Sequence, residues 1–180
     1  MMGALTPRIG DAKIAVARGN LPRAEALLDE TISQAGELQI SMVQSEALHD
    51  RAVVAGLRGR HDLAVELAYE ALRDCSSQID RDRILNDLGT AFHMLGLRSV
   101  ARDAFLVLSA TAQEQYMRWA ATLSLMAIEA EDGSQPMFDQ YRVQLKASEL
   151  SPKLQTEYYV RLGRAYHQLA HEDLEIGRAH

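Results

Sequence analysis

Residues 85–105, LNDLGTAFHMLGLRSVARDAF, indicate two amphipathic helices joined by a turn at Gly96. Gly96 is followed five residues later by Ala101, and the same spacing recurs at three other places: Gly19 to Ala24, Gly59 to Ala64 and Gly133 to Phe138. The four glycines lie 40, 37 and 37 residues apart, and a further step of 37 reaches Ala170. Recurrence at such a period predicts stacked copies of one supersecondary unit that share a continuous core.

Composition narrows the class of protein. The 180 residues are rich in alanine and leucine, which favours an all-helical chain. A net charge of −6 argues against nucleic acid as a partner. Cys75 is the single cysteine, which rules out an internal disulfide and fits a reducing compartment. No signal peptide and no run of about 18 apolar residues is present, so we expect a cytoplasmic protein without a membrane segment.

Turn residues and apolar spacing divide the chain into helices. The prolines stand where a helix would begin, and Thr6 and Ser151 precede two of them as candidate N-caps: Pro7, Pro22, Pro136 and Pro152. Ten helical segments are predicted: 7–18, 21–35, 40–57, 61–75, 81–95, 98–110, 113–131, 135–148, 152–170 and a short one from 172. The short links predict five antiparallel hairpins in one domain over 1–180, the last incomplete: 6–36, 40–76, 80–111, 112–149 and 151–180.

The third hairpin has the clearest motif. Its first helix carries an apolar residue, a Leu-Gly pair and an aromatic residue, and after the turn glycine its second helix carries an alanine and an aromatic residue. These residues are Leu85, Leu88, Gly89, Phe92, Gly96, Ala101 and Phe105. This pattern resembles the tetratricopeptide repeat, in a degenerate array of bacterial type. The fifth unit repeats it with Tyr159, Leu162, Gly163 and Tyr166, and the first two units match with Ala12, Ala15, Ala52 and Ala55. The resemblance implies a right-handed superhelical solenoid.

The fourth unit departs furthest from the motif. Met126 stands where a small residue belongs, Glu129 replaces an aromatic residue, and Phe138 replaces the alanine. We expect looser or rearranged packing there. Elsewhere, the mid-helix glycines Gly89 and Gly163 predict close approach of the paired helix, because glycine inside a helix is otherwise unfavourable.

No sequence motif indicates catalysis, so we expect neither an enzyme nor a bound cofactor. The best metal candidate is His167 with His171, four residues apart on one helix, but two imidazoles alone make an incomplete site and no metal is predicted. Two acidic groups are interpreted as solvated rather than as acid–base pairs: Glu129, Glu131 and Asp132, and Glu66 with Glu70.

Several other residues have two possible interpretations. Arg58, Gly59 and Arg60 with His61 favour a repeat turn over an anion-binding patch. Core packing is favoured over an exposed aromatic patch at four positions: Tyr116, Trp119, Phe138 and Tyr141. Cys75 is interpreted as a small half-buried residue rather than a nucleophile.

The resemblance also implies a partner surface, since tetratricopeptide arrays hold a peptide or a helix on the concave face formed by first helices. The predicted concave positions are Lys13, His49, Val53, Arg83, Asn86, Thr90, His93, Arg161, Arg164 and His167. These positions include four cations and no carboxylate, which predicts an acidic or C-terminal-carboxylate ligand. An ordinary solvated face remains the alternative. Only Lys13 and Asn86 match the family's chaperone-binding clamp, so chaperone tails are not predicted as ligands.

The predicted function is a non-catalytic module for binding a protein or peptide, acting as scaffold, adaptor or regulatory sensor. The incomplete last hairpin would expose Leu169, Leu174 and Ile176, which suggests either missing chain or self-association through the C-terminal end. Homodimerisation is therefore one alternative function. A metal- or small-molecule-responsive regulator centred on His167 and His171 is the other.

Overall fold

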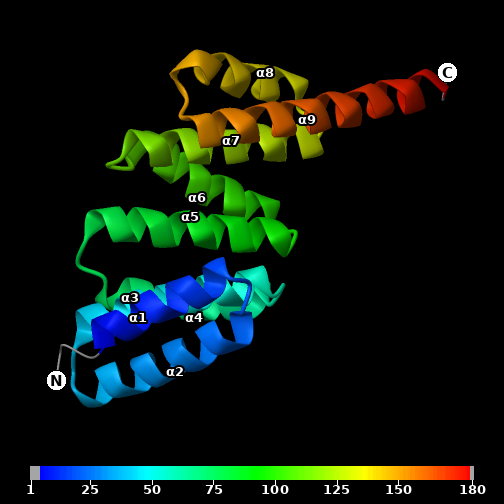
Figure 1. The fold of residues 1–180 in the computed structure, drawn as a ribbon. Helices are drawn as coiled ribbons and strands as arrows, with labels where there is room; N and C mark the ends of the chain where they lie inside the picture. Colours follow the sequence, from blue (N-terminus) through cyan, green and yellow to red (C-terminus); the bar gives the residue numbers. More distant parts are fainter. Residues whose placement is uncertain (1–4, 179–180) are drawn as a thin grey trace. The chain divides into compact units, whose positions relative to one another are not determined.

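The computed structural model describes the backbone of residues 5–178 and the side chains of residues 5–168, and this part of the chain is all-helical (Figure 1). Its elements are α1 (Leu5–Ala17), α2 (Leu21–Glu37), α3 (Ser41–Leu57), α4 (His61–Asp74), α5 (Gln78–Met94), α6 (Arg98–Thr111), α7 (Gln115–Glu131), α8 (Gln135–Gln144), the 3₁₀ helix η2 (Ala147–Glu149) and α9 (Pro152–Arg178). Two compact units are present, Met1–Ala101 and Arg102–His180, with the boundary inside α6.

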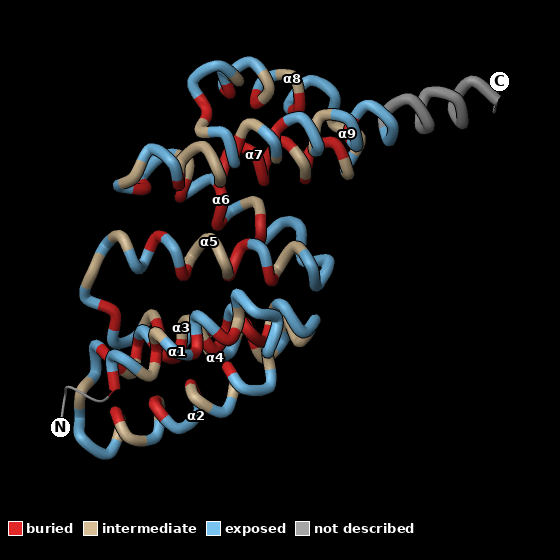
Figure 2. Tube along the Cα trace, viewed as in Figure 1, coloured by how far each residue is buried: buried red, intermediate tan, exposed pale blue. Residues whose placement is uncertain are grey.

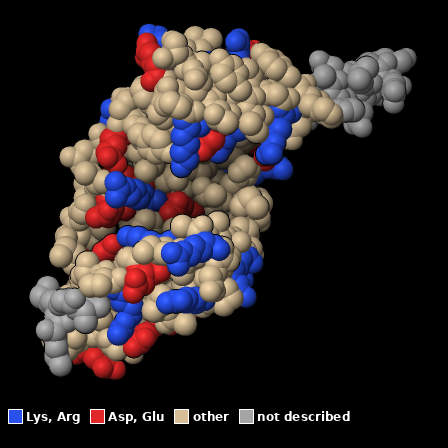
Figure 3. Space-filling view, in the orientation of Figure 1, with Lys and Arg blue, Asp and Glu red and all other residues tan. Residues whose placement is uncertain are grey.

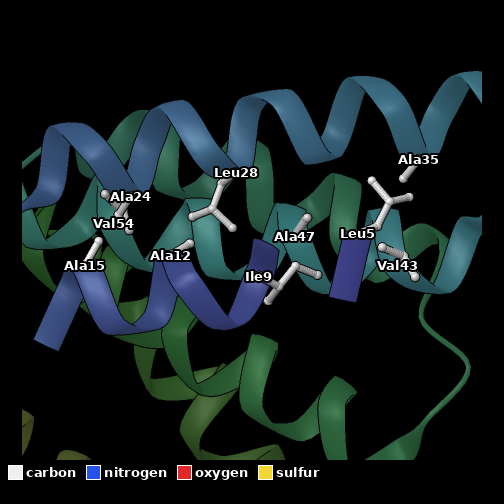
Figure 4. Packing of buried hydrophobic residues seen from close by; sticks show 10 residues of the cluster. All are labelled: Leu5, Ile9, Ala12, Ala15, Ala24, Leu28, Ala35, Val43, Ala47 and Val54. Carbon is white, nitrogen blue, oxygen red and sulfur yellow. The ribbon is translucent and has the colours of Figure 1, made fainter. Parts of the chain in front are cut away.

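The first unit is built by helices that pack in the order of the sequence. Each of the helices α1 to α4 packs against the next, and α3 also contacts α1 and α5. Buried positions face neighbouring helices, whereas the outer side of α2 is exposed (Figure 2). One core cluster alternates alanine with larger aliphatic residues (Figure 4): Leu5, Ile9, Ala12, Ala15, Ala24, Leu28, Ala35, Val43, Ala47 and Val54. The alanines let the helix axes approach, and the larger side chains fill the space between them.

In the second unit, α7 is the central helix. It packs against both α8 and α9, and residues 121–126 are buried without interruption. The two polar residues of this stretch are satisfied within the helix, because Thr122 Oγ1 donates to the carbonyl of Arg118 at 2.9 Å and Ser124 Oγ to that of Ala120 at 3.2 Å. Phe138 and Tyr141 of α8 and Leu154 and Tyr158 of α9 are buried as well.

The four predicted turn glycines are confirmed, and all adopt the same backbone geometry. Their φ angles are positive: Gly19 (74°), Gly59 (73°), Gly96 (76°) and Gly133 (68°). In each turn, the N–H of the residue after the glycine donates to the carbonyl five residues earlier, as from Arg60 to Ala55 at 2.9 Å. This pairing is the Schellman motif, which ends a helix with one residue in the left-handed region and favours glycine there.

The same geometry explains the residue five positions after each glycine. The residue that closes the Schellman motif is also the N-cap of the next helix, as Asn20 is for α2, where its side chain accepts from the N–H of Arg23. The first helical hydrogen bond therefore comes from the residue four positions later, as from Ala24 to Asn20 at 3.1 Å. All four residues at that position are buried: Ala24, Ala64, Ala101 and Phe138.

A fifth turn of this kind was not predicted from the sequence. Between α2 and α3, Gln39 has a φ of 55°, and Ile40 donates to Ala35 at 2.9 Å. Glycine is absent there, so the turn leaves no compositional signal even though its hydrogen bonds match those of the glycine turns. Because Gln39 has a side chain, its left-handed backbone conformation is sterically unfavourable by about 1–2 kcal/mol.

The predicted break at Ala170 is wrong, because α9 runs as one helix from Pro152 to Arg178. Alanine is the best helix former, and the left-handed turn is unfavourable for it. The helix therefore continues through position 170, where the repeat has alanine instead of glycine. The fifth unit is therefore not a hairpin. The side chains of Leu169, Leu174 and Ile176 lie outside the described residues.

The register predicted for α9 is also wrong. Tyr159 and Tyr166 are 58% and 49% exposed, and a Cβ added at Gly163 would meet no atom within 4 Å. The buried residues are one position earlier, at Tyr158 and Ala165. A shift of one residue turns a helix face by about 100°, so the predicted close approach at Gly163 does not occur. By contrast, Gly89 of α5 is buried, as the prediction requires.

In the fourth unit, the residues that depart from the motif are all buried. Met126 and Phe138 have no exposed surface, and Glu129 is 5% exposed. The interpretation of Glu129 as solvated is therefore wrong. Its carboxylate accepts from Arg102 Nε at 2.7 Å, and the same guanidinium reaches Asp132 at 2.6 Å. The ion pair joins α6 to α7 at the position of the motif's aromatic residue.

The turn geometry predicts opposite effects for two neighbouring glycines. Neither Gly56 nor Gly59 has an atom within 4 Å of an added Cβ, but only Gly59 has a positive φ. Gly56→Ala should raise the free energy of unfolding by about 0.5–1 kcal/mol through helix propensity. Gly59→Ala should lower it by about 1–2 kcal/mol through backbone strain. Chemical denaturation measures both, and equal shifts of one sign would contradict the turn assignment.

Candidate functional site

A pocket of about 480 Å³ opens in the first unit between the first helices of successive hairpins. Its lining comes from α1, α3, the last residue of α4, the link between α4 and α5, and α5: Thr6, Lys13, Met42, Val43, Ser45, Glu46, His49, Asp50, Asp74, Cys75, Ser76, Ser77, Asp80, Arg83 and Ile84. We call this the α1–α3–α5 pocket. Its volume is in the range of sites that hold small ligands or one or two side chains of a partner.

The link between α4 and α5 shapes one wall of the pocket. Unlike the glycine turns, it is extended, with ψ angles of 120° at Cys75 and 127° at Ser77. Arg81 Nε donates to the carbonyl of Cys75 at 2.8 Å, and Ser77 Oγ accepts from the N–H of Asp80 at the start of α5. These bonds fix the link at both ends, and Ser76 between them is exposed.

An ion-pair cluster crosses the pocket from α1 to α3. Lys13 Nζ lies 2.8 Å from Glu46 Oε1 and 3.3 Å from Asp50 Oδ2. Burial would lower the pKa of Lys13, but its hydrogen bond to Glu46 and the charge of Asp50 together raise that pKa. Burial raises the pKa of Asp50 despite the opposing charge of Lys13 and of His49. Asp50 is therefore a carboxylate that the fold holds at a desolvation cost.

Two further polar contacts involve the pocket's lining. His49 Nε2 lies 2.8 Å from Asp87 Oδ2 and so joins α3 to α5. Arg83 Nη1 lies 3.3 Å from Asp80 Oδ1 one turn earlier on α5. Three of the predicted groove residues, Lys13, His49 and Arg83, thus line the pocket, and each has an acidic neighbour.

The predicted groove positions carry no carboxylate, but the pocket that contains three of them does. The lining contains four carboxylates, Glu46, Asp50, Asp74 and Asp80, against the cations Lys13 and Arg83, a formal charge of 2 − 4 = −2 with His49 neutral. Acidic and basic side chains are intermixed on the face that carries α1 (Figure 3). The sequence prediction missed these carboxylates because it followed only one row of residues along each first helix. Glu46 and Asp50 lie on the neighbouring row of α3, and Asp74 ends a second helix.

The remaining predicted residues of the first unit lie outside this lining. Thr90 Oγ1 donates to the carbonyl of Asn86 at 3.0 Å, and Asn86 Nδ2 donates to Asp87 at 3.4 Å. Val53 is 36% exposed, and His93 lies in the last turn of α5. These residues lie on α3 and α5 without contributing to the pocket.

The predicted residues on α9 belong to the second unit. Arg161 donates from Nη1 to the carbonyl of Leu123 at 3.2 Å and to Ser124 Oγ at 3.3 Å. Burial lowers its pKa. Arg161 thus packs α9 onto α7 rather than facing a ligand. Arg164 and His167 are exposed and line a depression of about 330 Å³ together with Gly163 and Gln168 of the same helix.

The Arg58–Arg60 turn is confirmed as a repeat turn, and its arginines already have an anionic partner. Arg58 and Arg60 both pair with Glu25 of α2, and Arg51 Nη1 lies 3.0 Å from the same carboxylate. Arg51 also pairs with Asp29 at 2.8 Å. Three guanidinium groups pair with one nearly buried carboxylate and so hold the turn against α2. These arginines are therefore not available to bind an external anion.

The other candidates have less support. Among the described residues, no group of three His, Cys, Asp or Glu side chains could hold a metal ion, and the side chain of His171 lies outside them. Cys75 is buried. Of the aromatic residues, Phe138 and Tyr141 are in the core as predicted, but Tyr116 is 39% exposed.

No helix of the described chain is long and apolar enough to cross a membrane. Comparisons with models of known families, with curated proteins and with solved structures find no match to this chain.

The raised pKa of Asp50 predicts a pH-dependent effect of Asp50→Asn. In the folded chain this pKa lies above the ordinary 3.8. Stability therefore falls as pH rises through the window from 3.8 up to the folded value, where Asp50 loses its proton. Asparagine does not ionise, and Glu46 still holds Lys13 at 2.8 Å. Asp50→Asn should be more stable than the native chain at pH 7, with the advantage disappearing near pH 3.

Urea denaturation across that pH range measures the difference, with the exposed Asp11→Asn on α1 as the control. A variant that is less stable than the native chain at pH 7, or an advantage that grows towards low pH, would contradict the assignment.

Proposed function

We propose that the chain is a non-catalytic interaction module that holds a segment of a partner protein at the α1–α3–α5 pocket. The observation that carries the proposal is the pocket itself. It is formed by first helices of successive hairpins, it is lined by both apolar and charged side chains, and its ion pairs keep Lys13, Glu46 and Asp50 in fixed positions. Fixed polar groups around a partly apolar pocket give orientation and affinity together.

The pocket suits a bound segment better than a reaction. Lys13 is paired with Glu46 and Asp50, which restrains its amine as a proton donor or nucleophile. Met42 is 68% exposed beside this cluster. An exposed, adaptable side chain at the pocket mouth is a typical contact for an apolar side chain of a partner. The resemblance to tetratricopeptide repeats supports the same function, and the array and its superhelix are part of this proposal.

A pair of tryptophan substitutions separates the pocket from the face predicted by sequence alone. Ser76 is exposed in the pocket wall, whereas Thr90 is exposed on α5 outside it. Random peptides displayed on phage are selected on the native chain, and the affinity of enriched peptides is measured by fluorescence polarisation. Ser76→Trp should weaken binding about tenfold or more by filling the pocket, and Thr90→Trp should change it less than about twofold. Weakening by Thr90→Trp alone would place the partner on the other face.

Self-association through the C-terminal helix is the second candidate function. Apolar side chains of α9 are exposed in the single chain, with Tyr159 at 58%, Val160 at 49% and Tyr166 at 49%. Burying such a surface against a second copy would favour a dimer. Light scattering of the native chain should then show a mass that rises with concentration, and Val160→Lys should shift it to the monomer. A monomer at all concentrations would contradict this function.

A further inference from the structure

The carboxylates that line the α1–α3–α5 pocket outnumber its cationic side chains. Lys13 lies between Glu46 and Asp50, and Arg83 pairs with Asp80. Asp74 has Arg73 at 3.8 Å, beyond hydrogen-bond distance, and the Arg73 side chain is 74% exposed. Of the two surplus negative charges in the lining, one therefore lies at Glu46 and Asp50, which share Lys13, and the other lies at Asp74, where α4 ends.

The same end of the pocket is partly apolar. Cys75 and Ile84 are buried in its wall, and Met42 is exposed at its edge. A carboxylate beside apolar surface is the environment of a long cationic side chain, whose methylene stem packs on the apolar part while its head group reaches the acid. Arginine fits best, because its guanidinium can donate two parallel hydrogen bonds to one carboxylate.

We propose that the pocket selects a basic peptide segment, with an arginine or lysine side chain that reaches Asp74 and Asp80 and an apolar neighbour packed on Met42. This inference rests on the proposed function and adds the chemistry of the partner. It reverses the acidic ligand expected from the sequence. The net charge of −6 acts in the same direction, because it attracts cationic partners at long range and repels polyanions.

The peptide selection described above tests this chemistry. Enriched peptides should contain arginine or lysine more often than the starting library, and their affinity should fall as NaCl rises from about 0.05 to 0.5 M. Asp74→Asn combined with Asp80→Asn should weaken the best peptide about tenfold, and Asp74→Glu alone should retain most of the affinity. Asp103→Asn, an exposed acid on α6 outside the pocket, is the matched control for net charge and should change affinity less than about twofold.

The outcomes separate this inference from the function on which it rests. If no peptide binds in a way that Ser76→Trp disrupts, the proposed function fails, and the inference fails with it. If peptides bind at the pocket but are acidic or uncharged, or are indifferent to the Asp74 and Asp80 variants, the pocket is retained and the basic partner is excluded. If spermidine competes as effectively as the unlabelled peptide does, the ligand is a free cation and the proposal of a peptide partner is wrong.

Discussion

The glycine turn that ends four of the helices is the constraint on which the rest of the structure depends. A single residue with φ near 70° reverses the chain, and its hydrogen bonds make the next residue the N-cap of the following helix. Helices joined in this way pack as neighbours, and the fourth residue after each cap is buried, as Ala64 and Phe138 show. The choice of alanine or phenylalanine at that position then determines how closely the two helices approach.

Buried ion pairs complete this packing where apolar residues do not. Glu25 pairs with Arg51 of α3 and with Arg58 and Arg60 of the turn that follows it. Glu129 of α7 pairs with Arg102 of α6. Each carboxylate is almost buried, so each depends on its cations to offset the cost of desolvation. These pairs fix geometry more than they add net stability, and they use up the arginines that would otherwise be available to an anionic ligand.

The pocket differs from these pairs in having too few cations. Lys13 serves two carboxylates, and Asp50 keeps a raised pKa beside it. The fold therefore holds negative charge that its own side chains only partly neutralise, at Glu46 and Asp50 of α3 and at Asp74, where α4 ends. A cationic side chain from a partner would supply the missing positive charge. Carboxylates that lower the stability of the free chain would then favour binding of the partner.

By itself, the sequence determined the helices, the glycine turns and the buried residue five positions after each glycine, because all depend on local backbone geometry. It could not reveal the turn at Gln39, because glutamine does not favour the left-handed φ of 55° that it adopts there. The tertiary structure alone decided that α9 buries Tyr158 rather than Tyr159. It also decided the charge of the pocket, because Asp74 and Glu46 come together from different helices, at positions that no single periodicity connects.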